Sequence, residues 1–461
     1  MLVSQVIVVI LSLLGVAWCW YRPVYFLPAL IAVVPLEISR TWFPHLRALE
    51  TLSAFLGVID LARIFSLAFL AYVAWSLIRR HLYGRVREEA SFTLRGSSFE
   101  AGLLWMDELS WVNIVLFLVL GAYILLGFSS VLWSVNRTKT LVEAIRLTVL
   151  WSLGFASYYT LLRHKAFGLI PLSFAIISSG LAILGVSELI TKNFLWLGDV
   201  YAVSGRINGT FVDANIFARY LVIGILATFV LILSGVERRS FLLGLLALFL
   251  QTAALLGTGS RTGWLAAALV LLALWLILPQ RRLGFILLSL AGLAVIGTLL
   301  HPEILGRIKD LGKGLAFAST ERQFLVRAGW AMFVTHPLWG VGLGGFQTVM
   351  FTHYSDLIHN QISLSHTALL TTAAELGILG VAIILVFFFF LYSGIPQLRD
   401  REKIAPVMSG YRRIVMYTVF AVLSMTVIFI SAQGEGRFLE DPLLWILLGY
   451  WSALSHVEGV G

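Results

Sequence analysis

Apolar runs of about 20 residues recur along the chain, and each is long enough to cross the hydrocarbon core of a membrane as a helix. Of the 461 residues, 59% are hydrophobic and only 12% are charged, whereas a soluble domain has roughly 25% charged residues. Lipid admits only helices and closed barrels, and these runs are continuous rather than alternating. We therefore expect an all-α fold, a polytopic membrane helical bundle.

The runs predict 12 transmembrane helices, or 13 if the short segment 24–38 crosses the membrane rather than being re-entrant or interfacial. One sizeable non-membrane segment, 301–365, should contain short amphipathic helices. The predicted spans are 2–20, 24–38, 54–78, 110–132, 140–162, 167–187, 212–235, 240–258, 262–278, 283–300, 366–393, 412–431 and 441–457.

Basic residues predict the orientation, because cytoplasmic loops carry an excess of Lys and Arg. One set of alternate loops holds 16 of these residues and the other set holds 6. The first set is therefore predicted to be cytoplasmic, which places 301–365 outside, in the periplasm or on the cell surface. The same bias accounts for the net charge of +9, so a nucleic-acid partner is not indicated. A single cysteine, Cys19, excludes an intrachain disulfide and a cysteine-based metal site.

Arginines on the predicted outer side are the first candidates for chemistry. Arg206 lies before a span, and Arg261 lies in the short turn "GTGSRTGW". Arg322, Arg327 and Arg437 belong to the two outer loops that follow. A lone arginine at a membrane edge is explained by snorkelling or headgroup contact. Several together against the positive-inside trend favour a diphosphate ligand, because a guanidinium pairs with phosphate oxygens bidentately.

His366 begins the segment "SHTALLTTAAELGILG". On a continuous helix, Gly377 and Gly380 would return within about 40° of its direction, and small residues let a helix or lipid approach. The first turn of a helix disfavours imidazolium, and a neutral imidazole suits a general base. The alternative is a histidine simply hydrogen-bonded at the interface. Glu375 falls on the opposite face, where a packing or helix-bridging role is expected.

Other polar residues have local structural explanations. Asp60 with Arg63 and Glu143 with Arg146 are three apart, which predicts ion pairs within a helix. Asp213 and Asn215 are placed to cap the span that follows them, and His336 is expected to shape its loop. No metal-ligand spacing, P-loop, dinucleotide fingerprint or Gly-x-Ser-x-Gly elbow occurs. Chemistry is therefore expected to run without a metal or cofactor.

Taken together, these stretches resemble the O-antigen ligase and O-antigen polymerase superfamily of bacterial GT-C-type membrane glycosyltransferases. The resemblance covers about 200–445 and rests on five motifs in order. Its members show a His, a small polar residue, nine residues and Gly-x-x-Gly, which correspond here to His366, Thr367, Gly377 and Gly380, with Thr367 in place of the usual Asn, Ser or Gln. The other motifs are "GRINGTFVDANIFARYL", "GTGSRTGWLAA", "ERQFLVRAGWAMFVTHPLWGVGLGGF" and "ELGILG".

The resemblance implies three regions, namely N-terminal transmembrane helices (1–200), a catalytic region with the loop 301–365 (201–445), and a C-terminal end (446–461). It also implies a multi-pass protein of the bacterial inner membrane whose active site faces the periplasm. The donor would be a glycan on undecaprenyl diphosphate, held by Arg206, Arg261 and Arg322, with Arg327 and Arg437 secondary. His366 would deprotonate or orient the acceptor hydroxyl in an inverting transfer.

Three activities remain open from the sequence. An O-antigen ligase would move the glycan to an outer-leaflet acceptor such as lipid A–core, which is the activity we favour. A polymerase of O-antigen or exopolysaccharide would instead extend the carrier-linked repeat units. A transporter of lipid-linked sugar is the alternative of another class, but transporters bind their substrate near the midplane, whereas these charges lie at the outer rim.

Overall fold

The structure is a computed structural model that describes residues 2–43, 60–91, 111–195, 206–234, 238–277, 284, 320–353, 367–393, 409–436 and 438–459. No strand occurs in these ranges, which agrees with the predicted all-α class. Eight of the described helices are long and apolar enough to span a membrane, and three shorter helices are apolar. The expected total of 12 stays a prediction, because the segment 283–300 lies almost entirely outside the described residues.

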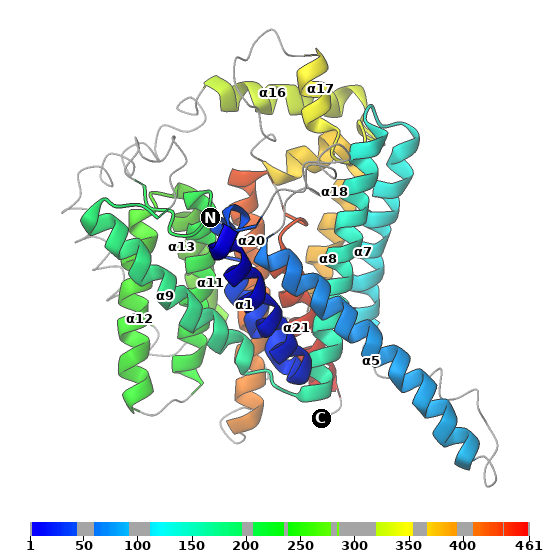
Figure 1. The fold of residues 1–461 in the computed structure, drawn as a ribbon. Helices are drawn as coiled ribbons and strands as arrows, with labels where there is room; N and C mark the ends of the chain where they lie inside the picture. The colour runs from blue at the N-terminus through cyan, green and yellow to red at the C-terminus, as the bar shows by residue number, and fades with distance from the viewer. Residues whose placement is uncertain are drawn as a thin grey trace.

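The helices form a bundle around α11 (Ala214–Leu233) (Figure 1). Within the apolar 18-residue stretch of α11, 89% of the residues are buried. The neighbours of α11 are α9 (Leu169–Thr191), α12 (Arg238–Gly257), α13 (Arg261–Ile277) and α20 (Ser409–Glu435). The apolar residues of the predicted spans thus form the interior of the bundle and also its exposed helix faces.

A second group packs beside α20. The helix α8 (Arg137–His164) lies against α21 (Pro442–Gly459) and α7 (Trp111–Ser129). Gly154 of α8 and Gly449 of α21 meet where these helices cross, since a Cβ at Gly449 would overlap the Gly154 carbonyl. Small residues allow this close approach between membrane helices.

The N-terminal helices complete the bundle. They are α1 (Leu2–Tyr21), the short α2 (Phe26–Val33) and the long α5 (Leu61–Ser91). The segment 24–38 is thus a helix of only 8 residues followed by a turn, too short to cross a bilayer alone. This agrees with a re-entrant or interfacial segment rather than a thirteenth span.

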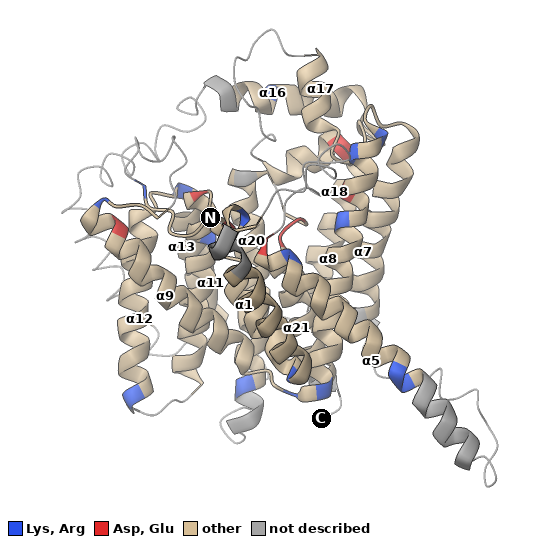
Figure 2. Cartoon of the chain, in the orientation of Figure 1, with Lys and Arg blue, Asp and Glu red and all other residues tan. Residues whose placement is uncertain are grey.

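Charge differs between the two ends of the bundle (Figure 2). We call the end where α8 and α13 begin the upper end, as drawn in Figure 1. Lys and Arg residues occur at both ends, with Arg163, Arg239 and Arg413 at the lower one, whereas the described Asp and Glu residues lie in the upper half. Which end faces the cytoplasm stays a prediction from the loop charges.

Two short helices cover the upper end, namely α16 (Thr320–Thr335) and α17 (Phe346–His353). They lie within the segment 301–365, where short helices were expected. Below them α18 (Ala368–Ser393) is broken at Gly377, whose φ of 65° and ψ of −161° are not helical. The assumption of one continuous helix was therefore wrong, so helix geometry no longer places Gly377 and Gly380 on one face. The physical reason is that the glycine adopts a conformation that L side chains rarely reach.

Candidate functional site

The segment around Arg206 is fixed to the turn between α12 and α13. The guanidinium of Arg206 donates from Nε to the Thr258 carbonyl oxygen (2.7 Å) and from Nη2 to Asn215 Oδ1 (2.8 Å). Ile207 N also donates to the Gly257 carbonyl oxygen at 3.3 Å. These contacts bring two of the predicted site residues, Arg206 and Arg261, to the same corner of the upper end.

The turn itself has the sharp geometry expected from its glycines. Gly259 has a φ of +59°, and Ser260 Oγ accepts a hydrogen bond from Gly263 N (3.2 Å), which caps α13. Arg261 is therefore the first residue of α13, and its side chain is exposed. The positive end of the helix dipole and an exposed guanidinium together favour an anionic ligand here.

The first turn of α18 is linked to this turn through the end of α20. Gln433 Oε1 accepts a hydrogen bond from Leu369 N (3.3 Å) in the first turn of α18. The next residue, Gly434, faces Thr262, because a Cβ at Gly434 would lie 2.8 Å from Thr262 Cγ2. The N-terminus of α13 and the first turn of α18 therefore flank the same turn of α20. His366 itself lies outside the described residues.

The helix α16 reaches the same place from the other side. A Cβ on Gly329 would lie 3.1 Å from Leu370 Cγ, so α16 crosses the first turn of α18. Arg327 is exposed two residues before this contact. Arg322 lies in α16 with its side chain outside the described part, and Arg437 is outside it altogether. The structure thus gathers the segments that carry Arg206, Arg261, Arg322 and Arg327 around the start of α18.

Glu188 holds the Arg206 segment in place and was missed by the sequence interpretation. Its carboxylate is 2% exposed and accepts backbone N–H groups from Leu195 (3.2 Å), Asn208 (3.3 Å) and Gly209 (2.9 Å). A lone carboxylate at the end of an apolar segment is a signal that could have found it.

A buried ion pair, also missed, joins α11 to the start of α21. Arg219 Nη2 lies 2.9 Å from Asp441 Oδ2, and both residues are almost fully buried. Asp441 Oδ1 also caps α21 by accepting from Leu443 N (2.8 Å). The two charged residues are 222 positions apart, so spacing alone gave no signal.

Glu37 adds a carboxyl to the same region. Its Oε2 accepts a hydrogen bond from Val212 N (2.8 Å). Burial raises the pKa of the Glu37 carboxyl, whereas the Val212 hydrogen bond and the positive charges of Arg40 and Arg219 act in the opposite direction. The N-terminal segment thereby contacts the loop that carries Arg206.

The local polar interactions predicted from spacing are confirmed. Arg63 and Asp60 approach to 3.4 Å and Arg146 and Glu143 to 3.1 Å. Asp213 is the N-cap of α11 and accepts from Asn215 N at 2.7 Å.

The expected bridging role of Glu375 is also confirmed, because its Oε1 accepts from Phe346 N (3.1 Å) at the start of α17.

Asn215 was also expected to cap α11. Its side-chain oxygen accepts a hydrogen bond from Arg206, which makes Asn215 part of the candidate site rather than a cap.

Comparison with known families finds one related family. Residues 245–385 match the family model described as O-antigen ligase, while a comparison with curated proteins finds no match. The match confirms the resemblance to the O-antigen ligase superfamily and indicates a membrane glycosyltransferase of the O-antigen ligase or polymerase type. The matched residues include Arg261, Arg322, Arg327 and position 366, whereas Arg206 and Arg437 lie outside them.

Proposed function

We propose that the chain is an O-antigen ligase that transfers a glycan from undecaprenyl diphosphate to lipid A–core in the outer leaflet of the bacterial inner membrane. The observation that carries this proposal is the meeting of the Arg206 segment, the N-terminus of α13 and α16 around the first turn of α18. The superfamily uses lipid-linked glycans and polysaccharide acceptors in general, and a diphosphate suits a corner rich in guanidinium groups.

The reaction would exchange one carbon–oxygen bond for another. The acceptor hydroxyl attacks the anomeric carbon, its proton passes to the imidazole of His366, and the bond to the diphosphate breaks. Undecaprenyl diphosphate leaves with both phosphates, and the configuration inverts. Arg206, Arg261 and Arg322 would stabilise the charge that develops on the leaving group, with Arg327 and Arg437 secondary, so that no metal is required.

Arg206 would serve this site partly through its position. Two of its five N–H donors hold Thr258 and Asn215, which fixes the plane of the guanidinium. Arg261 has the more exposed guanidinium. We therefore assign Arg261 the direct diphosphate contact and Arg206 a contact that also orders the turn.

The broken helix α18 is the feature that most resembles a transporter, because transporter sites are commonly formed by discontinuous helices at the midplane. Here, however, the backbone at the break is met by the loop after α16. Ile378 N donates to the Pro337 carbonyl oxygen (2.8 Å), and Gly342 N donates to that of Glu375 (2.9 Å). The break therefore docks a loop of the upper end, which favours transfer over transport.

The test is reconstitution of the purified protein with undecaprenyl-diphosphate-linked glycan and two acceptors. Glycan attached to lipid A–core supports the ligase, whereas lengthened carrier-linked chains would identify a polymerase. Movement of the donor across the bilayer without any glycosidic product would instead identify a transporter. A His366→Ala variant that keeps full turnover would refute the assigned base.

A further inference from the structure

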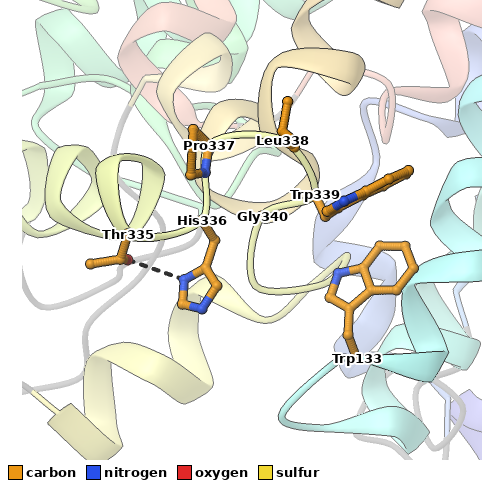
Figure 3. A pocket seen from close by; sticks show the side chains of 7 residues that line it. All are labelled: Trp133, Thr335, His336, Pro337, Leu338, Trp339 and Gly340. Carbon is orange, nitrogen blue, oxygen red and sulfur yellow. Dashed lines mark hydrogen bonds between the residues drawn. The ribbon is translucent and has the colours of Figure 1, made fainter.

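A cavity of about 460 Å³ opens at the upper end of the bundle, beside the loop that follows α16 (Figure 3). Its volume falls within the range of about 300–1,000 Å³ found for small-molecule sites. We call it the tryptophan pocket, and its lining residues are Trp133, Thr335, His336, Pro337, Leu338, Trp339 and Gly340.

Two indole rings form one side of the tryptophan pocket. Trp133 and Trp339 pack edge to face, with centroids 5.6 Å apart and planes at 61°. They remain 36% and 52% exposed, and within the described residues neither indole N–H has a hydrogen-bond partner. Large aromatic surfaces that stay open to a cavity usually mark a binding site.

His336 supplies a polar edge. Figure 3 shows its ring turned toward Thr335 through Nδ1, and the two atoms are 3.1 Å apart. The other ring nitrogen, Nε2, is then available to a ligand. The pocket therefore offers aromatic faces together with hydrogen-bonding groups at their rim.

The pocket is rigid because its loop is pinned to α18 at the break. A Cβ on Gly377 would overlap the Leu338 carbonyl and lie 2.7 Å from Trp339 N, and a Cβ on Gly340 would overlap the backbone of Glu375. Gly340 N also donates to the His336 carbonyl oxygen at 2.9 Å. A preorganised aromatic surface loses little entropy on binding.

We propose that the tryptophan pocket binds a saccharide portion of a substrate, and this rests on the proposed function. None of the seven lining residues is a Lys, Arg, Asp or Glu, which disfavours a phosphate or a cation. A lipid tail would leave Nε2 of His336 without a polar partner, whereas Nδ1 of His336 and Oγ1 of Thr335 already contact each other. A sugar ring matches both features, because its C–H faces stack on indole rings while its hydroxyl groups bond to the indole N–H groups and to His336.

The position of the pocket fits such a role in transfer. Leu369, beside the candidate site, and Gly377, beside the pocket, are eight residues apart on the first piece of α18. At 1.5 Å per residue, roughly 12 Å separates them. The pocket would thus hold sugar units beyond the one being joined. Because Trp133 lies outside the residues matched by the family model, the pocket combines matched and unmatched parts of the chain.

The experiment measures binding without turnover. The probe is the oligosaccharide that mild acid releases from the carrier-linked glycan of the producing cells, and its Kd for the full-length protein in nanodiscs is measured by ligand-observed NMR. We expect Trp133→Leu and Trp339→Leu each to weaken binding about tenfold, equivalent to about 1.4 kcal/mol, with Trp339→Phe retaining most of the affinity.

The matched control is Trp330→Leu. Trp330 is 59% exposed on α16 and does not line the pocket, so its replacement should leave the Kd unchanged. Equal affinity of the Trp133 and Trp339 variants and the unaltered protein, with equal thermal unfolding, would overturn the proposal. So would loss of binding in the Trp330→Leu control to the same extent.

Two further arms separate the remaining possibilities. Nanodiscs of brominated lipid would quench Trp133 and Trp339 if these rings faced the bilayer, and that quenching would overturn the saccharide site. In transfer assays, a raised KM for the donor or for the acceptor at constant kcat shows which substrate supplies the sugar. Intact oligosaccharide binding without any transfer would refute the proposed reaction while supporting the pocket.

Discussion

Replacing Gly377 with alanine should disrupt the junction between α18 and the loop that carries Trp339. The backbone at Gly377 (φ 65°, ψ −161°) lies in a region that is essentially restricted to glycine, and a side chain there costs about 1–3 kcal/mol. The added Cβ would also overlap the Leu338 carbonyl, and overpacking costs about 1–3 kcal/mol more. A total near 2–6 kcal/mol is a large part of an ordinary protein's stability, about 5–15 kcal/mol.

The assay is thermal unfolding of the purified protein, followed by its transfer rate. Gly180→Ala is the matched control, because Gly180 also lies in a membrane helix and a Cβ there meets no atom within 4 Å. Alanine at Gly180 should be neutral or stabilising by about 0.5–1 kcal/mol. If Gly377→Ala unfolded at the same temperature as Gly180→Ala and kept its activity, the break in α18 and its docked loop would be wrong.

Three other substitutions test the contacts that support the site. Glu188→Gln should destabilise the protein by about 1–3 kcal/mol, because one amide oxygen cannot accept all three backbone N–H groups; an unchanged unfolding midpoint would exclude that role. Arg219→Ala should cost about 3–5 kcal/mol by leaving Asp441 buried without its ion pair, and the double variant Arg219→Met with Asp441→Leu should recover most of it in the same unfolding assay. Gln433→Leu removes the acceptor for Leu369 N. It should lower kcat while costing only about 1 kcal/mol of stability, whereas an unaltered kcat would show that α20 does not support the site.

The helices could be predicted because their signal is local. An apolar run of about 20 residues has few alternatives in lipid, and α8, α9, α11 and α12 begin and end within a few residues of the predicted spans. The ion pairs of Asp60 with Arg63 and of Glu143 with Arg146 were also predictable, since a helix brings residues three apart together whatever surrounds it.

The break in α18 could not be predicted from that pattern. "ELGILG" is as apolar as its surroundings, and a glycine is tolerated inside a helix. What decides the outcome is the loop at 337–342, in which Pro337, Val341 and Gly342 supply hydrogen-bond partners to the backbone of α18 from 33 to 41 residues away in the sequence. A local pattern contains no information about such a distant partner.

The candidate site also has a part that the local sequence predicts and a part that it does not. The turn at Gly259 and the position of Arg261 follow from local turn chemistry. The link from α13 to α18 depends on Gln433 and Gly434, two residues that form no distinctive pattern in the sequence. Sequence reasoning therefore singled out the segments that the structure brings together, but not the contacts of α20 that join them.

In the proposed reaction, arginines at the upper end hold the diphosphate of the donor. Arg261→Gln is the sharpest test of this site, because the exposed Arg261 side chain begins α13 and is the assigned contact. The measurement is kcat/KM for the undecaprenyl-diphosphate-linked donor in proteoliposomes, beside the control Arg239→Gln at the lower end of α12, where the side chain is also exposed. We predict a fall of about 10²–10³ for Arg261→Gln, as for a lost oxyanion contact, and no change for Arg239→Gln. Equal values for the two variants would contradict the account.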